Sequence, residues 1–187
     1  MEALISQYLQ LLEVWNRRIN LVQRDTLKSA FERHIVDSLQ IYDLVKDVSS
    51  PIIDIGSGAG FPGAVLSIYG INNIVLCEKN FKKASFLREL KNNLMLNYEI
   101  FNDDIIKFQG MGYISVSRAF GNLSKLLDIM LRISSYRGIF HKGERYMEEL
   151  EEASNYFDFE YDLIQSRTNR KSRIIDVRNI RRKTWER

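Results

Sequence analysis

Four glycines fall within residues 56–63 of this chain, directly after a short apolar segment that contains one carboxylate. The full stretch, residues 52–63, reads IIDIGSGAGFPG. This pattern is typical of a strand that turns sharply into a helix, because glycine adopts positive φ and lets a ligand approach the backbone. Pro62 falls where a first helical residue tolerates a missing N–H. The stretch therefore predicts a cradle for a nucleotide-like cofactor.

Phosphate-containing ligands are the first alternatives for this turn. A P-loop needs Gly-Lys-Ser/Thr after the turn, and no such sequence follows. Gly58, Gly60 and Gly63 do spell the dinucleotide fingerprint G-x-G-x-x-G, with Glu78 twenty residues beyond Gly58. Asp54 argues against that interpretation, because a carboxylate repels an anionic pyrophosphate but attracts a sulfonium cation.

In the other frame the turn has the form Asp54-x-Gly56-x-Gly58-x-Gly60, which resembles the first motif of Rossmann-like methyltransferases. This frame predicts S-adenosylmethionine as the cofactor. Glu78 would then end the second strand, where a carboxylate accepts hydrogen bonds from the ribose hydroxyls. An acid at that position also serves NAD, so Glu78 supports the fold more than the choice of cofactor.

Two acids follow the third expected strand. Asp103 and Asp104 fall where this fold contacts the adenine, although they could equally cap a short helix at Ile105. Arg118 lies within the otherwise apolar segment YISVSRAF, and a buried guanidinium requires a partner. That partner is either a ligand or one of the acids of the core.

The elements that must position these residues alternate along the chain. Residues 2–21 and 27–46 have helical periodicity and predict an N-terminal helical cap over residues 1–48. Residues 49–187 predict one compact S-adenosylmethionine-binding methyltransferase domain of the α/β class, with a Rossmann-like, mostly parallel sheet. Its expected strands lie at residues 51–56, 73–78, 98–102, 113–117 and 137–142, and its expected helices at 61–69, 81–96 and 122–133. Residues 159–165 and 172–180 predict a C-terminal antiparallel hairpin.

Composition limits the class of protein. The chain has 187 residues, 45% of them apolar, and a net charge of +3, which is typical of a single globular domain. Its one cysteine, Cys77, cannot form an internal disulfide, and no Cys/His cluster has metal-ligand spacing, so no metal is expected. No apolar run approaches the ~20 residues of a membrane helix. These features predict a cytoplasmic protein, without a membrane partner and without obligate oligomers, so that a monomer is expected.

The charge is distributed unevenly. Residues 166–187 hold nine Lys or Arg against two acids, so the rest of the chain is net negative. A basic segment fits a polyanion such as RNA, although a solvated terminal strand explains it equally well. Arg170, Lys171 and Arg173 are the RNA-binding candidates of this segment.

Four segments together carry a resemblance to one family. They are WNRRINLV (15–22), RHIVDSL (33–39), DIGSGAGFPG (54–63) and SRAF (117–120). In this order and spacing the chain resembles the glucose-inhibited division protein B family, the bacterial guanine-N7 methyltransferases of small-subunit (16S) ribosomal RNA. Val22 departs from the pattern, because the family usually has Thr there.

The resemblance implies a site and a substrate. Its cofactor site would comprise Gly56, Gly58, Gly60, Phe61, Glu78, Ile105, Ile106 and Arg118, together with the acids Asp54 and Asp104 suggested by the motif. Its partner would be small-subunit ribosomal RNA, either free or within an assembling subunit. Guanine N7 has a free lone pair at neutral pH, so no general base is required, and catalysis would rest on orientation and on a polar, desolvated pocket.

Further residues are candidates for orienting the RNA or shaping the pocket. They are Asn16, Asn20, Arg33, His34 and Lys142. Other roles remain open for them: a helix cap or interhelical contact for the asparagines, packing against the sheet for His34, and solvent exposure for Lys142. A nicotinamide-dependent oxidoreductase and a non-catalytic RNA-binding or cell-division factor are the alternative functions.

Overall fold

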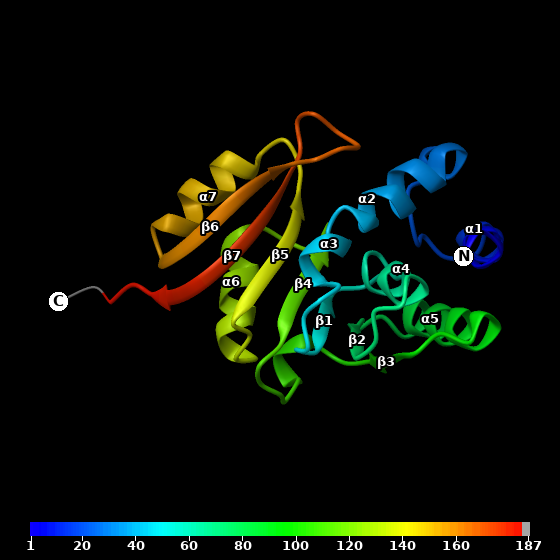
Figure 1. Cartoon of the computed structure of the whole chain (residues 1–187), viewed down its shortest axis with the longest axis horizontal. Coiled ribbons are helices and arrows are strands. Elements are labelled where there is room, and N and C mark those ends of the chain that lie inside the picture. Colours follow the sequence, from blue (N-terminus) through cyan, green and yellow to red (C-terminus); the bar gives the residue numbers. More distant parts are fainter. Residues whose placement is uncertain (185–187) are drawn as a thin grey trace.

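A seven-stranded sheet forms the centre of the molecule in the computed structural model, which describes residues 1–184 (Figure 1). Residues 185–187, which include Glu186 of the basic segment, lie outside the described residues. The strand order is β3-β2-β1-β4-β5-β7-β6. Strands β1 to β5 pair in parallel, whereas β7 pairs antiparallel with both β5 and β6. The predicted fold class is therefore confirmed, including the C-terminal antiparallel hairpin.

The strands are short on one side of the sheet and long on the other. Their bounds are β1 Ile52–Ile55, β2 Ile74–Cys77, β3 Tyr98–Phe101, β4 Ile114–Arg118, β5 Arg137–Lys142, β6 Phe157–Gln165 and β7 Arg173–Arg182. β7 lies between β5 and β6, so its residues Ile174, Ile175 and Val177 are buried. The basic C-terminal segment is thus partly an interior strand and not only a tail.

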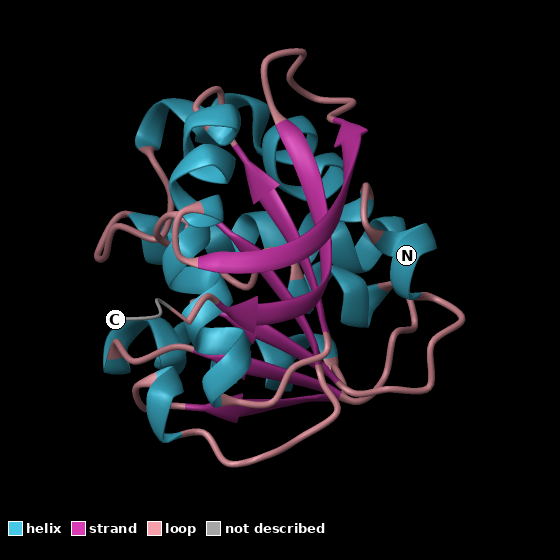
Figure 2. Cartoon of the chain, turned by 90° about the vertical axis from the view of Figure 1, so that its left-hand side faces the viewer, coloured by secondary structure: helices cyan, strands magenta, loops and turns pink. Residues whose placement is uncertain are grey.

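Helices cover both faces of the sheet (Figure 2). One apolar cluster joins β-strand residues such as Ile52 and Ile74 to α1 (Glu2–Asn16), α4 (Gly63–Ile68) and α5 (Phe81–Leu94). The other joins Ile53 and Ile55 to α6 (Leu123–Arg132) and α7 (Tyr146–Ser154). Adjacent residues of β1 thus enter opposite clusters, as expected of a strand buried on both sides.

The N-terminal segment differs from its prediction in two places. The first helix ends at Asn16, because the Asn16 side chain accepts hydrogen bonds from the N–H groups of Leu21 and Val22 and so replaces a helical turn. Residues 27–46 do not form one continuous helix. They are divided among a 3-10 helix η1 (Arg24–Ser29), a π-helix η2 (Phe31–Val36), α2 (Asp37–Leu39) and α3 (Tyr42–Val45).

Two short elements complete the fold. The 3-10 helix η3 (Ile105–Lys107) begins after Asp104, whose side chain accepts the N–H of Ile106. Helix α7 is not predicted from the sequence, because it is short and buries only Leu150 and Ala153, so its apolar periodicity is weak. Among residues 1–184, no helix has both the length and the apolar character that crossing a bilayer requires.

Candidate active site

The glycine-turn cavity lies at the carboxyl ends of β1, β2 and β4, where open α/β sheets bind ligands. Its volume is about 390 Å³. Its lining comes from the turn after β1, the end of β2, η3, and the segment between β4 and α6. The lining residues are Gly56, Gly58, Cys77, Glu78, Lys79, Lys83, Asp103, Asp104, Ile105, Ile106, Ala119, Phe120, Lys125, Asp128 and Ile129.

Glu78 is the best-fixed polar group of this cavity. One carboxylate oxygen accepts the N–H of Gly58 at 3.0 Å, and the other accepts the N–H of Asn80 at 2.7 Å. Each oxygen keeps a further lone pair, and the side chain lines the cavity. Glu78 can therefore accept hydrogen bonds from a pair of ligand hydroxyls without moving.

Backbone conformation makes room for a ligand beside Glu78. Gly56 and Gly58 have φ of +73° and +57°, a region that L-residues rarely adopt. A Cβ atom at Gly56 would overlap the ring of Phe120, which covers this part of the turn. Ile105 is buried and Ile106 is largely exposed, and the two add apolar surface to the cavity beside the acids Asp103 and Asp104.

Asp54 occupies a different place from the one expected. It is fully buried under the turn, where one carboxylate oxygen accepts the N–H of Gly63 at 3.0 Å and the other has no hydrogen-bond partner among the described residues. Burial raises the pKa of Asp54 to about 7, despite the hydrogen bond from Gly63. The expectation that Asp54 faces the cofactor is corrected, because its carboxylate points toward α4 and does not line the cavity.

Gly60 and Phe61 also lie behind the cavity wall. The Phe61 ring stacks on Tyr8 of α1, with centroids 5.4 Å apart, and on His34, with centroids 5.0 Å apart. The Tyr8 hydroxyl donates a hydrogen bond to the carbonyl of Ala59 in the turn. Ala59 and Phe61 therefore anchor the turn to the N-terminal helices.

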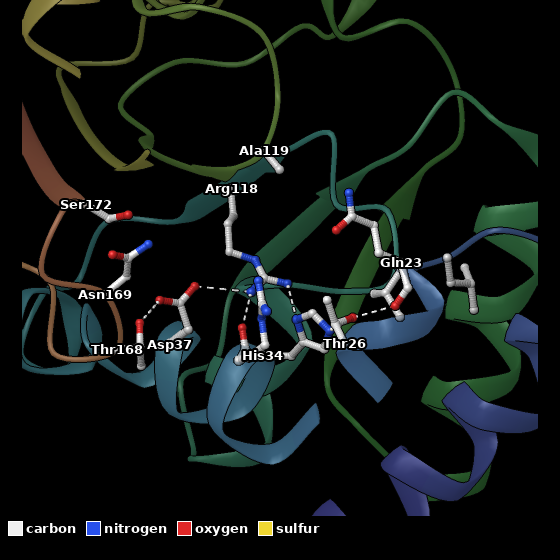
Figure 3. Close-up of a pocket in the computed structure, with 12 residues that line it drawn as sticks. Gln23, Thr26, His34, Asp37, Arg118, Ala119, Thr168, Asn169 and Ser172 are labelled. Atoms are coloured by element: carbon white, nitrogen blue, oxygen red, sulfur yellow. Dashed lines mark hydrogen bonds and ion pairs between the residues drawn. The ribbon is translucent and has the colours of Figure 1, made fainter. Parts of the chain in front are cut away.

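A second, larger cavity lies beside the first and is called here the Arg118 cavity (Figure 3). Its volume is about 720 Å³. The N-terminal segment, the end of β4 and the loop between β6 and β7 contribute to it. Its lining residues are Leu21, Val22, Gln23, Thr26, Arg33, His34, Asp37, Arg118, Ala119, Thr168, Asn169 and Ser172.

Arg118 is held by several partners in this cavity (Figure 3). One guanidinium nitrogen donates to the Asp37 carboxylate at 3.1 Å and to the carbonyl of Arg33 at 2.8 Å. Its guanidinium carbon also lies 4.7 Å from the centroid of the Phe61 ring. Of the two partners left open for this arginine, the structure shows an acid of the chain, Asp37, and it places the guanidinium in the Arg118 cavity.

The protonation of His34 follows from its neighbours. Arg118 can only donate, so Nδ1 of His34, 3.1 Å away, accepts. Nε2 then carries the proton and faces the Thr26 hydroxyl at 2.9 Å, and that hydroxyl donates onward to the carbonyl of Gln23. Burial, and then the Arg118 charge, lower the pKa of His34 to about 4. His34 is therefore a neutral, fully engaged group and not a general base.

Asp37 joins Arg118 to the loop of residues 166–172. Its second carboxylate oxygen accepts the hydroxyl of Thr168 at 2.6 Å and the amide of Gln40 at 2.8 Å. Gln40 in turn accepts the N–H of Arg167. This network ties the basic loop to the end of β4.

Among residues 1–184, Ala119 alone lines both cavities. Arg118 before it belongs to the larger cavity, and Phe120 after it belongs to the smaller one. The two cavities therefore meet at the end of β4, so ligands in them would approach each other there.

The remaining expected residues lie in several environments. Asn16 is buried, and its amide is used within the turn after α1, so the expectation that Asn16 contacts RNA is corrected. Lys142 is also buried, bonded to Glu149 and to the carbonyl of Gly121. It lines neither cavity and is not placed to touch RNA. Asn20 is exposed, outside both linings, and Arg33 is exposed at the edge of the Arg118 cavity.

Some basic residues of the C-terminal segment form ion pairs and others do not. Lys171, Arg178, Arg182 and Lys183 pair with Glu144, Asp162, Asp128 and Asp158, respectively. Arg173 donates to the carbonyls of Arg170 and Ser172 and so stabilises the loop. Within residues 1–184, Arg167, Arg170 and Arg181 form no ion pair, and the first two flank the part of the loop that lines the Arg118 cavity.

Comparison with known proteins shows the family of the chain. The model of the family described as rRNA small subunit methyltransferase G (GidB) matches residues 1–175. The chain belongs to this family. The resemblance inferred from the sequence is thereby confirmed, as is the predicted class of enzyme, a methyltransferase of small-subunit ribosomal RNA. The alternatives, an oxidoreductase and a non-catalytic factor, find no support.

Relatives in the GidB family match over most of their length. The chain is 37% identical over 173 residues to ribosomal RNA small subunit methyltransferase G of Orientia tsutsugamushi (strain Boryong), covering 92% of this chain and 87% of the relative. It is 36% identical over 172 residues to the protein of the same name from Rickettsia felis, covering 91% and 90%.

Solved structures show the same fold at low sequence identity. Magnesium protoporphyrin IX methyltransferase (ChlM) from Synechocystis PCC 6803 with bound SAM aligns with a TM-score of 0.61 at 13% identity, over 89% of this chain and 90% of that one. M. jannaschii TYW2 in complex with AdoMet aligns with a TM-score of 0.53 at 17% identity, over 78% and 76%. The GidB-family chain thus has the fold of S-adenosylmethionine-dependent methyltransferases.

Several lining residues of this GidB-family site are not found by sequence reasoning. Phe120 and Asp37 lie inside the segments SRAF and RHIVDSL, so their motifs mark the region without assigning them a role. Thr26, Thr168 and Asn169 carry no local signal, since they reach the site only through tertiary contacts. No group of three or more His, Cys, Asp or Glu side chains that could hold a metal occurs in the described part of the chain.

Proposed function

We propose that the chain methylates N7 of one guanine in small-subunit (16S) ribosomal RNA. The glycine-turn cavity holds S-adenosylmethionine, and the Arg118 cavity receives the guanine. The observation that carries this proposal is the shared wall at Ala119: one cavity contains a fixed carboxylate, and the adjoining one contains an arginine and a loop with further basic residues.

The glycine-turn cavity fits this cofactor better than a dinucleotide. Its lining includes four carboxylates and three lysines, and this balance lacks the positive field that a pyrophosphate requires. The Glu78 oxygens are available to ribose hydroxyls, and Ile105 and Ile106 offer an apolar wall to an adenine. When bound, S-adenosylmethionine would supply an activated methyl group.

The residues of the Arg118 cavity support orientation rather than proton transfer. Guanine N7 attacks through its lone pair and loses no proton, so a base would have no role. His34 is neutral and engaged at both ring nitrogens, which agrees with such a reaction. Arg118 is fixed by Asp37 and by the carbonyl of Arg33, so it can present its remaining donors to the guanine or its phosphate.

The substrate must enter from the side of the basic loop. A guanine in folded RNA has to be unstacked before it can fill a cavity. Arg33, Arg167 and Arg170 lie on exposed parts of the segments that line the Arg118 cavity and would contact the RNA backbone. Residues 1–48 would act as a cap that closes this cavity. A monomer acting in the cytoplasm remains our expectation.

Nucleoside mapping tests the proposal in cells. Small-subunit ribosomal RNA is isolated from cells that lack this protein and from the same cells complemented with the natural chain or with Arg118→Lys. We expect N7-methylguanosine to disappear from one position, to return with the natural chain, and to stay low with the variant. A full level of N7-methylguanosine at every position in the deletion strain would refute the proposal.

A further inference from the structure

The segment Ala119–Asn122 contributes Ala119 and Phe120 to the lining of the glycine-turn cavity. It connects β4 to α6 and carries Phe120 over Gly56. Ala119 has a φ of +56°, a conformation that costs a non-glycine residue about 1 kcal/mol or more. A segment with this backbone needs contacts from outside to keep one conformation.

Lys142 and Glu149 provide those contacts from β5 and α7. The Lys142 ammonium donates to the carbonyl of Gly121 at 2.9 Å and pairs with the Glu149 carboxylate at 2.6 Å. The same Glu149 oxygen accepts the N–H of Leu123 at 2.8 Å. The pair therefore binds the chain on both sides of Asn122, once at a carbonyl and once at an amide.

Lys142 and Glu149 are largely buried, although neither of them lines a cavity. The side chains of Lys142 and Glu149 are 5% and 17% exposed, and neither lines the glycine-turn cavity or the Arg118 cavity. Burial lowers the pKa of Lys142, and the bond to Glu149 opposes that effect. A buried ion pair contributes less to stability than apolar side chains of similar volume would. We therefore explain its presence by the hydrogen bonds with which it holds the segment Ala119–Asn122 in one conformation.

We propose that Lys142 and Glu149 form a positioning pair that fixes Phe120 over the glycine turn and thereby sets the affinity for S-adenosylmethionine. This inference rests on the function proposed above. It replaces the expected role of Lys142 in touching the RNA with an indirect role in binding the cofactor.

β5 offers a matched control at its other end. Arg137, the first residue of the strand, forms a partly buried ion pair with Asp176 at 2.6 Å. That pair connects β5 to β7, and Arg137 also donates to the carbonyl of Leu44 at 3.1 Å. Among the described residues, none of its hydrogen bonds reaches the segment after β4. Replacing Arg137 therefore removes a comparable ion pair from the same strand without disturbing Phe120.

The experiment compares Lys142→Met, Glu149→Gln and Arg137→Met with the natural chain. Titration calorimetry measures the dissociation constant of S-adenosylhomocysteine, steady-state kinetics gives KM for S-adenosylmethionine and for RNA, and thermal unfolding monitors stability. We expect Lys142→Met to weaken cofactor binding about tenfold, equivalent to ~1.4 kcal/mol, with KM for RNA unchanged. Glu149→Gln should have a smaller effect, because its amide oxygen still accepts the N–H of Leu123.

The control decides between positioning and general stability. Arg137→Met should lower the unfolding temperature yet leave cofactor affinity unchanged. Equal affinity in Lys142→Met and the natural chain, or an equal loss in Arg137→Met, would overturn the inference. If Lys142→Met does not fold, natural affinity in Glu149→Gln would overturn it equally. A natural chain that binds no S-adenosylhomocysteine would instead refute the proposed function.

Discussion

Arg118 donates a hydrogen bond to Nδ1 of His34 and so determines which nitrogen of that ring carries the proton. A cation and a histidine in contact would repel each other if the ring were charged, and the arginine cannot lose its proton. The consequence is a neutral ring that serves as a support for the guanidinium. The contact therefore accounts for a buried histidine that stays neutral beside a permanent positive charge.

The protonation state of His34 can be measured directly. The chain has only two histidines, and the second, His141, donates from Nε2 to the carbonyl of Asp37. Burial lowers the pKa of His141 below its usual 6.5, so long-range ¹H–¹⁵N NMR should show both rings neutral at about pH 7, with the proton on Nε2. His34 should titrate near 4 instead of 6.5. The His34→Gln variant assigns the signals, and an imidazolium at His34 above about pH 6 would contradict the predicted network.

The low pKa of His34 also predicts that the folded protein loses stability in acid. Because its pKa is lower in the folded chain than in the unfolded chain, its contribution is complete above 6.5 and is lost as the pH falls toward about 4. Urea unfolding across this range should show a smaller decrease in His34→Gln than in the natural chain. Parallel curves for the two proteins would show that His34 titrates normally.

The raised pKa of Asp54 predicts the opposite dependence of stability on pH. Its pKa is raised from 3.8 to about 7, so its contribution to stability is present below 3.8 and is lost as the pH rises through about 7. Asp54→Asn keeps an acceptor for the N–H of Gly63 but cannot ionise. The variant should gain stability relative to the natural chain as the pH rises from about 5 to about 8, by roughly 2–3 kcal/mol. Urea unfolding at the two pH values measures this, and an unchanged difference would mean that Asp54 ionises normally.

Gly56 is the residue at which a single methyl group should abolish cofactor binding. Gly56→Ala combines an unfavourable φ of +73° with an overlap between the new Cβ and the Phe120 ring. Gly112 has nearly the same φ, +75°, but open space around it, so Gly112→Ala is a matched control for backbone strain. We expect S-adenosylhomocysteine affinity to fall more than about tenfold in the first variant only, as measured by calorimetry. Equal affinities in the two variants would place the cofactor elsewhere.

Arg167 and Arg170 should determine the salt dependence of RNA binding. Each is exposed and forms no ion pair among residues 1–184, so each can replace counterions on a phosphate. The double variant Arg167→Gln, Arg170→Gln should flatten the plot of log K against log salt by about 0.7–0.9 per lost phosphate contact. Arg178→Gln is the control, because Arg178 is already paired with Asp162. An equal change in slope for the double variant and for Arg178→Gln would show that the loop is not the contact surface.

Local patterns were sufficient for part of the site. Gly56, Gly58 and Glu78 line the glycine-turn cavity as predicted, because a turn and a strand end place them there and spacing along the chain encodes both. The parallel sheet and its terminal hairpin followed from apolar runs of the right length. These features depend on interactions between residues that are near one another in the sequence or in adjacent strands.

Side-chain direction was the part that the sequence did not reveal. Asp54 and Lys142 stand at the expected strand ends, yet each points into the protein and binds another element, α4 in one case and α7 in the other. Asn16 likewise serves its own turn. The contact between Thr168 and Asp37 spans 131 positions and leaves no trace in local periodicity.

The position of β7 has a consequence for synthesis of the protein. β5 has an open edge, and β6 has no partner, until residues 173–182 have been translated and have left the ribosome. The nascent chain must therefore hold an unpaired strand edge at β5 until β7 inserts. The wall formed by Thr168 and Asn169 is completed only at that step. The Arg118 cavity is therefore assembled after the glycine turn, whose strands β1 and β2 come much earlier in the chain.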